Sequence, residues 1–190
     1  MVDMVAIPES ALQIQQMHAA FSKLRLEAWL VDTLWTWQWW LLIALFVLPW
    51  IVWWHLVDRK RLTEICLFGM FVLATASWMD ELGTELMLWY YPYKIIPYYP
   101  QLVPINYTVL PITFMLIYQY TSTWYSYVMT MTVMAAVFSW VAEPALKFMG
   151  IYTLITWRYS YSFPLYLIIA VSHRWLLEKI LATAKKYKKP

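Results

Sequence analysis

The stretch "WQWWLLIALFVLPWIVWWHLV", residues 37–57, decides the fold class of this chain, because its 21 positions hold no aspartate, glutamate, lysine or arginine. About 20 predominantly apolar residues in an α-helix are enough to cross the roughly 30 Å hydrocarbon core of a bilayer. Tryptophans stand near both ends, where an indole ring can meet acyl chains and headgroups together. We therefore predict a membrane-spanning helix, kinked near Pro49 because proline removes a backbone donor.

The composition of the whole chain supports a membrane protein. Hydrophobic residues make up 63% of the 190 positions, and charged residues only 13%. A soluble domain carries about a quarter charged residues, so a soluble globule of this size would lack the polar surface to cover its interior. The 14 tryptophans are typical of aromatic belts at the membrane surface. The alternative, an aromatic-rich soluble core, is disfavoured.

Four further spans are predicted between prolines and polar turns, at about 62–88, 104–120, 124–142 and 164–182. We expect Pro111 to kink the third helix, and Glu143-Pro144 to end or bend the fourth. Residues 145–162 are too short and polar to span, and they predict an interfacial or re-entrant element. The predicted fold class is an all-α integral membrane bundle of about five transmembrane helices plus an N-terminal amphipathic helix.

Three parts of the chain are predicted to have different surroundings. Residues 1–36 form an amphipathic interfacial segment, residues 37–182 the five-helix transmembrane domain, and residues 183–190 a basic cytoplasmic tail. In the first part, apolar residues recur at helical spacing, and Ser10 with Gln13 suits a capping box. We expect this helix to lie along the membrane surface, with packing against its own protein as the equal alternative.

The distribution of lysine and arginine predicts the orientation, because these residues collect on the cytoplasmic side of multi-pass proteins. With residues 58–61, "DRKR", in the cytoplasm, nine of the 14 basic residues fall inside and five outside. This favours a multi-pass cell-membrane protein with an extracytoplasmic N-terminus and a cytoplasmic C-terminus.

Several polar residues are expected to meet at the outer end of the bundle. The candidate polar site consists of Asp80, Glu81, Glu85, Asn106, Glu143 and Arg158. Unpaired carboxylates in a lipid-shielded layer are costly. We therefore expect either a counter-charge, with Arg158 and Lys147 as candidates, or a protonated carboxyl group.

Four interpretations of this acidic cluster stay open. The first is a salt-bridge network that holds the outer loops, and the second is a site that binds or conducts a small cation, proton or amine. The third is the acid and base pair of an enzyme acting on a lipid or isoprenoid at the outer leaflet. In the fourth, the protein is a binding or regulatory subunit that docks through its N-terminal amphipathic helix. Phosphate loops and the common hydrolase and zinc motifs do not occur, so a non-enzymatic protein is favoured.

The expected partners follow from the same features. They are membrane lipids, a small cation or amine as ligand, and a membrane protein or second copy of the chain, with no nucleic acid. No cofactor or metal is predicted, because His55 and His173 lack a third ligand at usable spacing.

Three stretches resemble a family of small multi-pass membrane proteins from Bacillus-like spore-forming bacteria, for which no function is assigned. These are "LWYYPYKIIPYYP", "LPITFMLIYQY" and "VAEPALKFMGIYTLITWRYSYSFPLY", within residues 75–170. The resemblance implies a bacterial plasma membrane and an all-helical fold, and carries over no catalytic residue. It implies that Asp80, Glu85, Glu143 and Arg158 belong to the shared pattern.

Overall fold

The computed structural model describes residues 8–187 and shows a nearly all-α protein. The α-helices are α1 (Glu9–Ala28), α2 (Trp37–Leu56), α3 (Leu62–Glu85), α4 (Leu110–Tyr120), α5 (Trp124–Val137), α6 (Glu143–Phe148) and α7 (Tyr159–Tyr187). Short helical turns adjoin them: η1 (Trp29–Thr33), η2 (Arg59–Arg61), η3 (Ile105–Val109) and η4 (Phe138–Ala142). Two strands, β1 (Trp89–Tyr90) and β2 (Thr153–Leu154), pair antiparallel.

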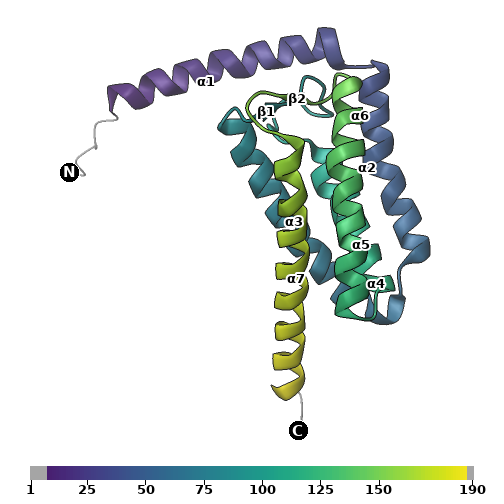
Figure 1. The fold of residues 1–190 in the computed structure, drawn as a ribbon. Coiled ribbons are helices and arrows are strands. Elements are labelled where there is room, and N and C mark those ends of the chain that lie inside the picture. Colours follow the sequence, from purple (N-terminus) through teal and green to yellow (C-terminus); the bar gives the residue numbers. More distant parts are fainter. Residues whose placement is uncertain (1–7, 188–190) are drawn as a thin grey trace, which may run out of the picture.

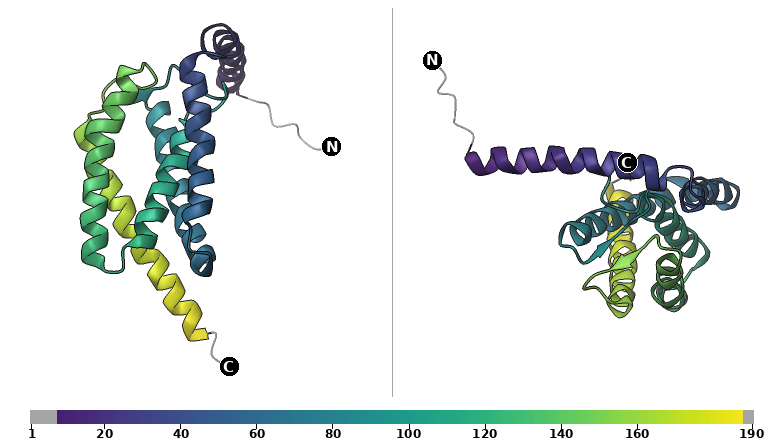
Figure 2. Two further views of the ribbon diagram at one scale, coloured as in Figure 1. Left: turned by 90° about the vertical axis from the view of Figure 1, so that its right-hand side faces the viewer. Right: turned by 90° about the horizontal axis from the view of Figure 1, so that it is seen from above.

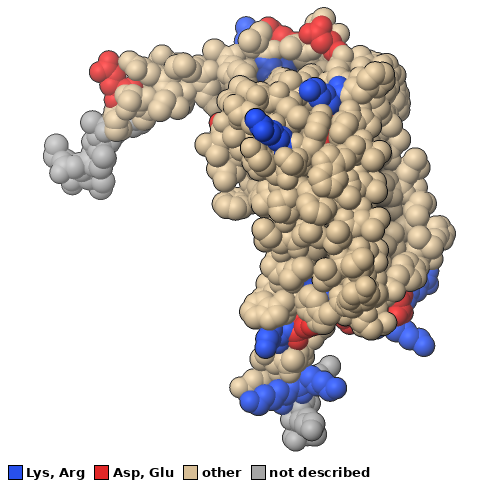
Figure 3. All heavy atoms as spheres, in the orientation of Figure 1, with Lys and Arg blue, Asp and Glu red and all other residues tan. Residues whose placement is uncertain are grey.

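Three helices are long and apolar enough to cross a membrane, namely Trp37–Leu56, Arg59–Glu85 and Trp124–Phe148. The predicted span at 37–57 is confirmed as α2, which Thr36 caps by accepting a hydrogen bond from Trp39 N. Helices α2 to α7 form a bundle in which α3 contacts both α4 and α7 (Figure 1). Lysines, arginines and acidic residues gather toward the two ends of this bundle on the face shown in Figure 3, as expected for lipid around its middle.

Helix α1 lies across one end of the bundle, which we call the α1 end, and α7 runs toward the other (Figures 1 and 2). The predicted capping box is wrong, because α1 begins after Pro8 with no side-chain cap. None of its residues is buried. Ile14 and Met17 keep 67% and 73% of their surface exposed, although both are apolar.

Two π-helical turns continue helices that prolines were expected to interrupt. In η3, Leu110 N–H donates to Ile105 O, and in η4, Glu143 N–H donates to Phe138 O. Pro111 and Pro144 follow directly, and each lacks the N–H that would reach the carbonyl four residues back. A wider turn accommodates the missing N–H, and the fourth helix continues to Phe148. Of the two alternatives expected at Glu143-Pro144, an end or a bend, the end is therefore wrong.

The segment predicted to be interfacial or re-entrant, residues 145–162, contains α6, strand β2 and the start of α7. Strand β2 pairs with β1, with Trp89 opposite Leu154 and Tyr90 opposite Thr153. The backbone carbonyl of Leu88 also accepts hydrogen bonds from three successive amides, residues 155–157. The two connections at the α1 end are therefore tied to each other.

Two ion pairs lie toward the opposite end of the bundle, each between residues three or four positions apart in the chain. Arg61 Nη2 lies 2.7 Å from Glu64 Oε1. Arg174 is buried, pairs with Glu178 at 2.9 Å and lies over the rings of Trp124 and Tyr127. Of the predicted basic tail, residues 183–187 continue α7, while 188–190, like residues 1–7 of the N-terminal segment, lie outside the described residues.

Candidate functional site

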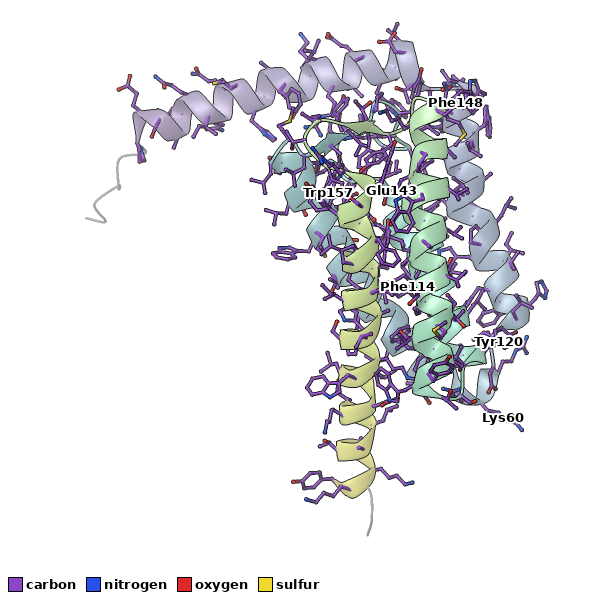
Figure 4. The ribbon with its side chains drawn as sticks, viewed as in Figure 1. Lys60, Phe114, Tyr120, Glu143, Phe148 and Trp157 are labelled. Atoms are coloured by element: carbon purple, nitrogen blue, oxygen red, sulfur yellow. The ribbon has the colours of Figure 1, made fainter. Side chains whose placement is uncertain are left out.

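A cavity of about 120 Å³ lies inside the bundle near the α1 end, and we call it the carboxylate cavity. Asp80 from α3 and Glu143 from α6 both line it and are both buried. Figure 4 shows Glu143 and Trp157 near the α1 end and Phe114 closer to the middle of the bundle. Two acidic side chains from distant parts of the sequence thus line the same cavity.

The Asp80 carboxylate is held by four neutral donors. Its Oδ1 accepts hydrogen bonds of 2.7 Å from both Trp89 Nε1 and Tyr91 Oη, and its Oδ2 accepts from Leu102 N and Asn106 Nδ2. These donors come from the connection after α3 and from η3, so one carboxylate anchors that connection to the bundle. Such charge-assisted hydrogen bonds replace the hydration that Asp80 loses on burial.

The Glu143 carboxylate has fewer partners. Oε2 accepts a hydrogen bond of 3.0 Å from Ser162 Oγ, and Oε1 accepts one of 3.0 Å from Tyr166 Oη, both on α7. Trp157 Nε1 donates in turn to Ser162 Oγ at 3.0 Å. A carboxylate has about four lone-pair positions, so Glu143 keeps acceptor capacity that Asp80 has used.

The π-helical turns η3 and η4 set the direction of two polar side chains in this site. Asn106 lies inside η3, and Glu143 follows η4 directly. A π turn changes the rotation between the segments before and after it, so it redirects every side chain that follows. Such turns are often found at functional sites.

Paired aromatic rings form much of the cavity wall. Trp89 and Trp157 pack edge to face with ring centroids 5.1 Å apart, and Tyr91 stacks on Tyr152 at 5.5 Å. All four rings line the cavity. Burial, followed by the charge of Asp80, raises the pKa of the Tyr91 hydroxyl far above its ordinary value, so Tyr91 remains a donor at neutral pH.

Toward the middle of the bundle the cavity wall is apolar. Val72, Phe114 and Ile169 line it there, and all three are buried. No polar path from the carboxylates toward the opposite end is present among these wall residues. The lining of the cavity therefore changes from polar near the α1 end to apolar toward the middle of the bundle.

The structure brings together only part of the predicted polar site. Asp80, Asn106 and Glu143 line the carboxylate cavity, whereas Glu81 and Arg158 are exposed and outside it. Glu85 is exposed and lines a different cavity. The expected counter-charges, Arg158 and Lys147, do not pair with the buried carboxylates, because both are exposed. Among residues 8–187, the hydrogen-bond donors to the two carboxylates are neutral.

A second cavity, of about 590 Å³, lies between α1 with η1 and the connection that follows α3, and we call it the α1 cavity. Arg25, Lys94, Asp32 and Glu85 line it together with several aromatic side chains. Trp29 Nε1 donates to Lys94 O at 2.9 Å, which ties η1 to this connection. Tyr91 lines both cavities.

Sequence reasoning did not find Trp89, Tyr91, Ser162 and Tyr166 as partners of the carboxylates. A sign was present in the sequence, since Trp and Tyr pair a large ring with a polar tip suited to a buried acceptor.

Histidine, cysteine and acidic side chains do not group into a metal site in the part of the chain that the structure describes. His173 contacts Thr75 Oγ1 at 2.9 Å and the carbonyl of Phe71 at 3.0 Å, whereas His55 is exposed on α2.

Comparison with protein-family models, with curated proteins and with solved structures finds no match to this chain.

Proposed function

We propose that this protein is a multi-pass membrane protein that binds a small organic cation, a primary amine or quaternary ammonium ion, in the carboxylate cavity. The observation that carries the proposal is the charge of the cavity. Asp80 and Glu143 are acidic, and the lining residues of the cavity include no lysine, arginine or histidine. A cation would supply the opposite charge that the protein itself does not place there.

The chemistry of the wall favours an organic cation over a metal ion. Indole and phenol rings attract ammonium groups through their π faces, most strongly where water is excluded. Trp89, Trp157, Tyr91 and Tyr152 supply four such rings. Hard metal ions instead require six or more oxygen ligands, and the four donors on Asp80 occupy much of its capacity.

The volume of the carboxylate cavity limits the size of its ligand. An engineered cavity of about 150 Å³ in another protein holds benzene, which has six heavy atoms. A cavity of about 120 Å³ therefore suits a cation of about five heavy atoms. Tetramethylammonium and ethylammonium fall within this limit, and tetraethylammonium exceeds it.

The membrane arrangement that we propose includes all five helical segments of the bundle as spans, with α4 and α7 beside the three apolar helices. The α1 end faces away from the cytosol, because Arg59–Arg61 and the lysines of α7 occupy the other end. Helix α1 lies in the membrane surface. The carboxylate cavity would then lie at the depth of the outer leaflet, where extracellular amines can reach it.

The same contacts support binding over the alternative of lipid or isoprenoid chemistry. A general acid or base must exchange a proton with its substrate. Asp80 accepts hydrogen bonds on both oxygens from four groups that also hold the connection after α3 in place, so a proton transfer at Asp80 would disrupt those contacts.

Calorimetric titration of the purified protein in detergent micelles tests this function. We expect tetramethylammonium and ethylammonium to bind, and tetraethylammonium and neutral ethanol not to bind. Glu143→Gln should weaken binding at least about tenfold, which corresponds to about 1.4 kcal/mol. Glu81→Gln, which removes an exposed carboxylate at the same end, is the matched control and should bind as wild type does.

A second variant changes the volume of the cavity instead of its charge. Ala76 is buried and lines the cavity, so Ala76→Leu should fill the space without removing a charge. If Glu143→Gln and Ala76→Leu both fold and bind tetramethylammonium with wild-type affinity, the proposal is wrong.

A further inference from the structure

The α1 cavity differs from the carboxylate cavity in size, charge and position. Its volume of about 590 Å³ falls within the range of about 300–1,000 Å³ typical of ligand sites. Two basic and two acidic side chains line it, so its formal charges balance. It is bounded by α1, which lies across the end of the bundle, and by the connection after α3.

The two basic groups come from separate elements. Arg25 on α1 donates from Nη1 to the carbonyls of Pro97 and Tyr98, at 3.3 and 3.2 Å. Its Nε is buried and has no hydrogen-bond partner among the described residues. Lys94 is partly buried, and its Nζ lies 5.6 Å from the centre of the Tyr90 ring. It has no anionic partner within salt-bridge distance among residues 8–187. A buried N–H and a partly buried ammonium group without an anion are costly to leave unpaired.

Asp32 on η1 and Glu85 on α3 line the same cavity, and both are exposed. The two basic side chains would attract a ligand that carries only negative charge, and the two acidic side chains would repel it. A ligand with one negative and one positive group could instead match both pairs of side chains.

The apolar surface of α1 extends outward from the cavity. Phe21 and Leu24 line it, and Ile14 and Met17 precede them on the same face at helical spacing. All four side chains are more than half exposed. An amphiphile with its polar group in the cavity would have an apolar surface beside it on which to lay its chains.

We propose that the α1 cavity binds the headgroup of a zwitterionic phospholipid of the phosphatidylethanolamine class. The phosphate contacts Arg25 and Lys94, the ammonium group contacts Glu85 and Asp32, and the acyl chains lie along the apolar face of α1. This proposal requires a membrane around the bundle but does not depend on amine binding in the carboxylate cavity. It applies to either leaflet.

Native mass spectrometry of the protein released from detergent micelles can test the assignment, with phosphatidylethanolamine, phosphatidylglycerol and diacylglycerol as separate probes. We expect phosphatidylethanolamine to be retained most, and diacylglycerol, which lacks the phosphate, to be retained least. Lys94→Gln should lower retention of both phospholipids at least about fivefold. Glu85→Gln should lower retention of phosphatidylethanolamine alone, because only that headgroup carries an ammonium group.

Lys23→Gln is the matched control, because Lys23 is an exposed cation on the same helix and lies outside the cavity. It should retain both phospholipids as wild type does. The Lys94 side chain makes no hydrogen bond in the described structure, so its substitution by glutamine should leave the melting temperature unchanged. Unchanged retention in a folded Lys94→Gln variant would overturn the proposal. So would displacement of the lipid by an equal concentration of soluble glycerophosphoethanolamine, which would show a site for the headgroup chemistry without the membrane lipid.

Discussion

The hydroxyl of Tyr91 donates a hydrogen bond to Oδ1 of Asp80 at 2.7 Å, and the Tyr91 side chain lines both the carboxylate cavity and the α1 cavity. Tyr91 therefore separates a small anionic space inside the bundle from a larger, charge-balanced one beneath α1. Its position depends on Asp80, which also holds Trp89, Leu102 and Asn106. This one carboxylate therefore holds four residues that line the carboxylate cavity, one of which also lines the α1 cavity.

Asp80→Asn should destabilise the protein strongly. An asparagine presents an NH₂ group where a carboxylate oxygen accepted two hydrogen bonds, so two buried donors lose their acceptor. Loss of two hydrogen bonds to a charged group costs about 3 kcal/mol. A thermal melt in detergent should show a clear fall in melting temperature. Glu81→Gln, one residue along and exposed, should change stability by less than about 0.5 kcal/mol. Equal melting temperatures for the two variants would contradict the anchoring role of Asp80.

Gly83→Ala should disturb the hydrogen bond between Trp89 and Asp80. A Cβ atom at Gly83 would overlap the six-membered ring of Trp89, whose Nε1 donates to Asp80. Because an indole ring cannot bend away, the ring must shift, and overpacking of this kind costs about 1–3 kcal/mol. Gly69→Ala is the comparison, since its Cβ would meet the flexible side chain of Met115. The melting temperature should fall more for Gly83→Ala, and a larger loss for Gly69→Ala would refute this account.

Pro144→Ala tests whether the π turn sets the position of Glu143. Alanine restores the N–H that can reach the carbonyl of Trp140, so an ordinary α-helical turn can replace η4. The helix should keep or gain stability, while Glu143 rotates away from Ser162 and Tyr166. Titration with tetramethylammonium should show weaker binding, and a melt should show no loss of stability. Wild-type affinity would mean that the π turn does not position the carboxylate.

Lys94 predicts a pH dependence of phospholipid binding. Burial, and next the charge of Arg25, lower its pKa to about 8, against the opposing effect of Asp80 and Glu85. The protonated form is the one that attracts phosphate, so retention of phosphatidylethanolamine should fall as the pH rises from 7 to 9. A bound phosphate favours the charged ammonium, so the midpoint should lie above about 8 in the complex.

Lys94→Arg provides the control for this pH dependence, because a guanidinium group keeps its charge throughout the range. The remaining charged or titratable side chains that line the cavity are unchanged in the variant; they are Arg25, Asp32, Glu85, Tyr90, Tyr91 and Tyr93. A profile that is flat in Lys94→Arg and falls in wild type would support the assignment. Parallel profiles would assign the pH dependence to another group.

Asp80 and Glu81 show which part of the site could not be predicted from the sequence. Asp80 and Glu81 were both predicted as members of one polar cluster, yet Asp80 is buried with four donors and Glu81 is exposed. Successive residues on an α-helix point about 100° apart, so one faces the bundle and the next faces outward. The direction of the bundle is set by packing between helices, which the local sequence does not contain.

By itself, the sequence predicted a membrane protein and the position of its most apolar helix, because a long uncharged run and a surplus of tryptophan can be read without the fold. The span at 37–57 therefore appears as α2. Only the tertiary structure decided which acids share a cavity, since the donors to Asp80 and Glu143 lie 9 to 26 residues away along the chain. It also decided that the helices continue at Pro111 and Pro144 through π turns. This continuity depends on backbone hydrogen bonds to the carbonyl five residues back instead of four.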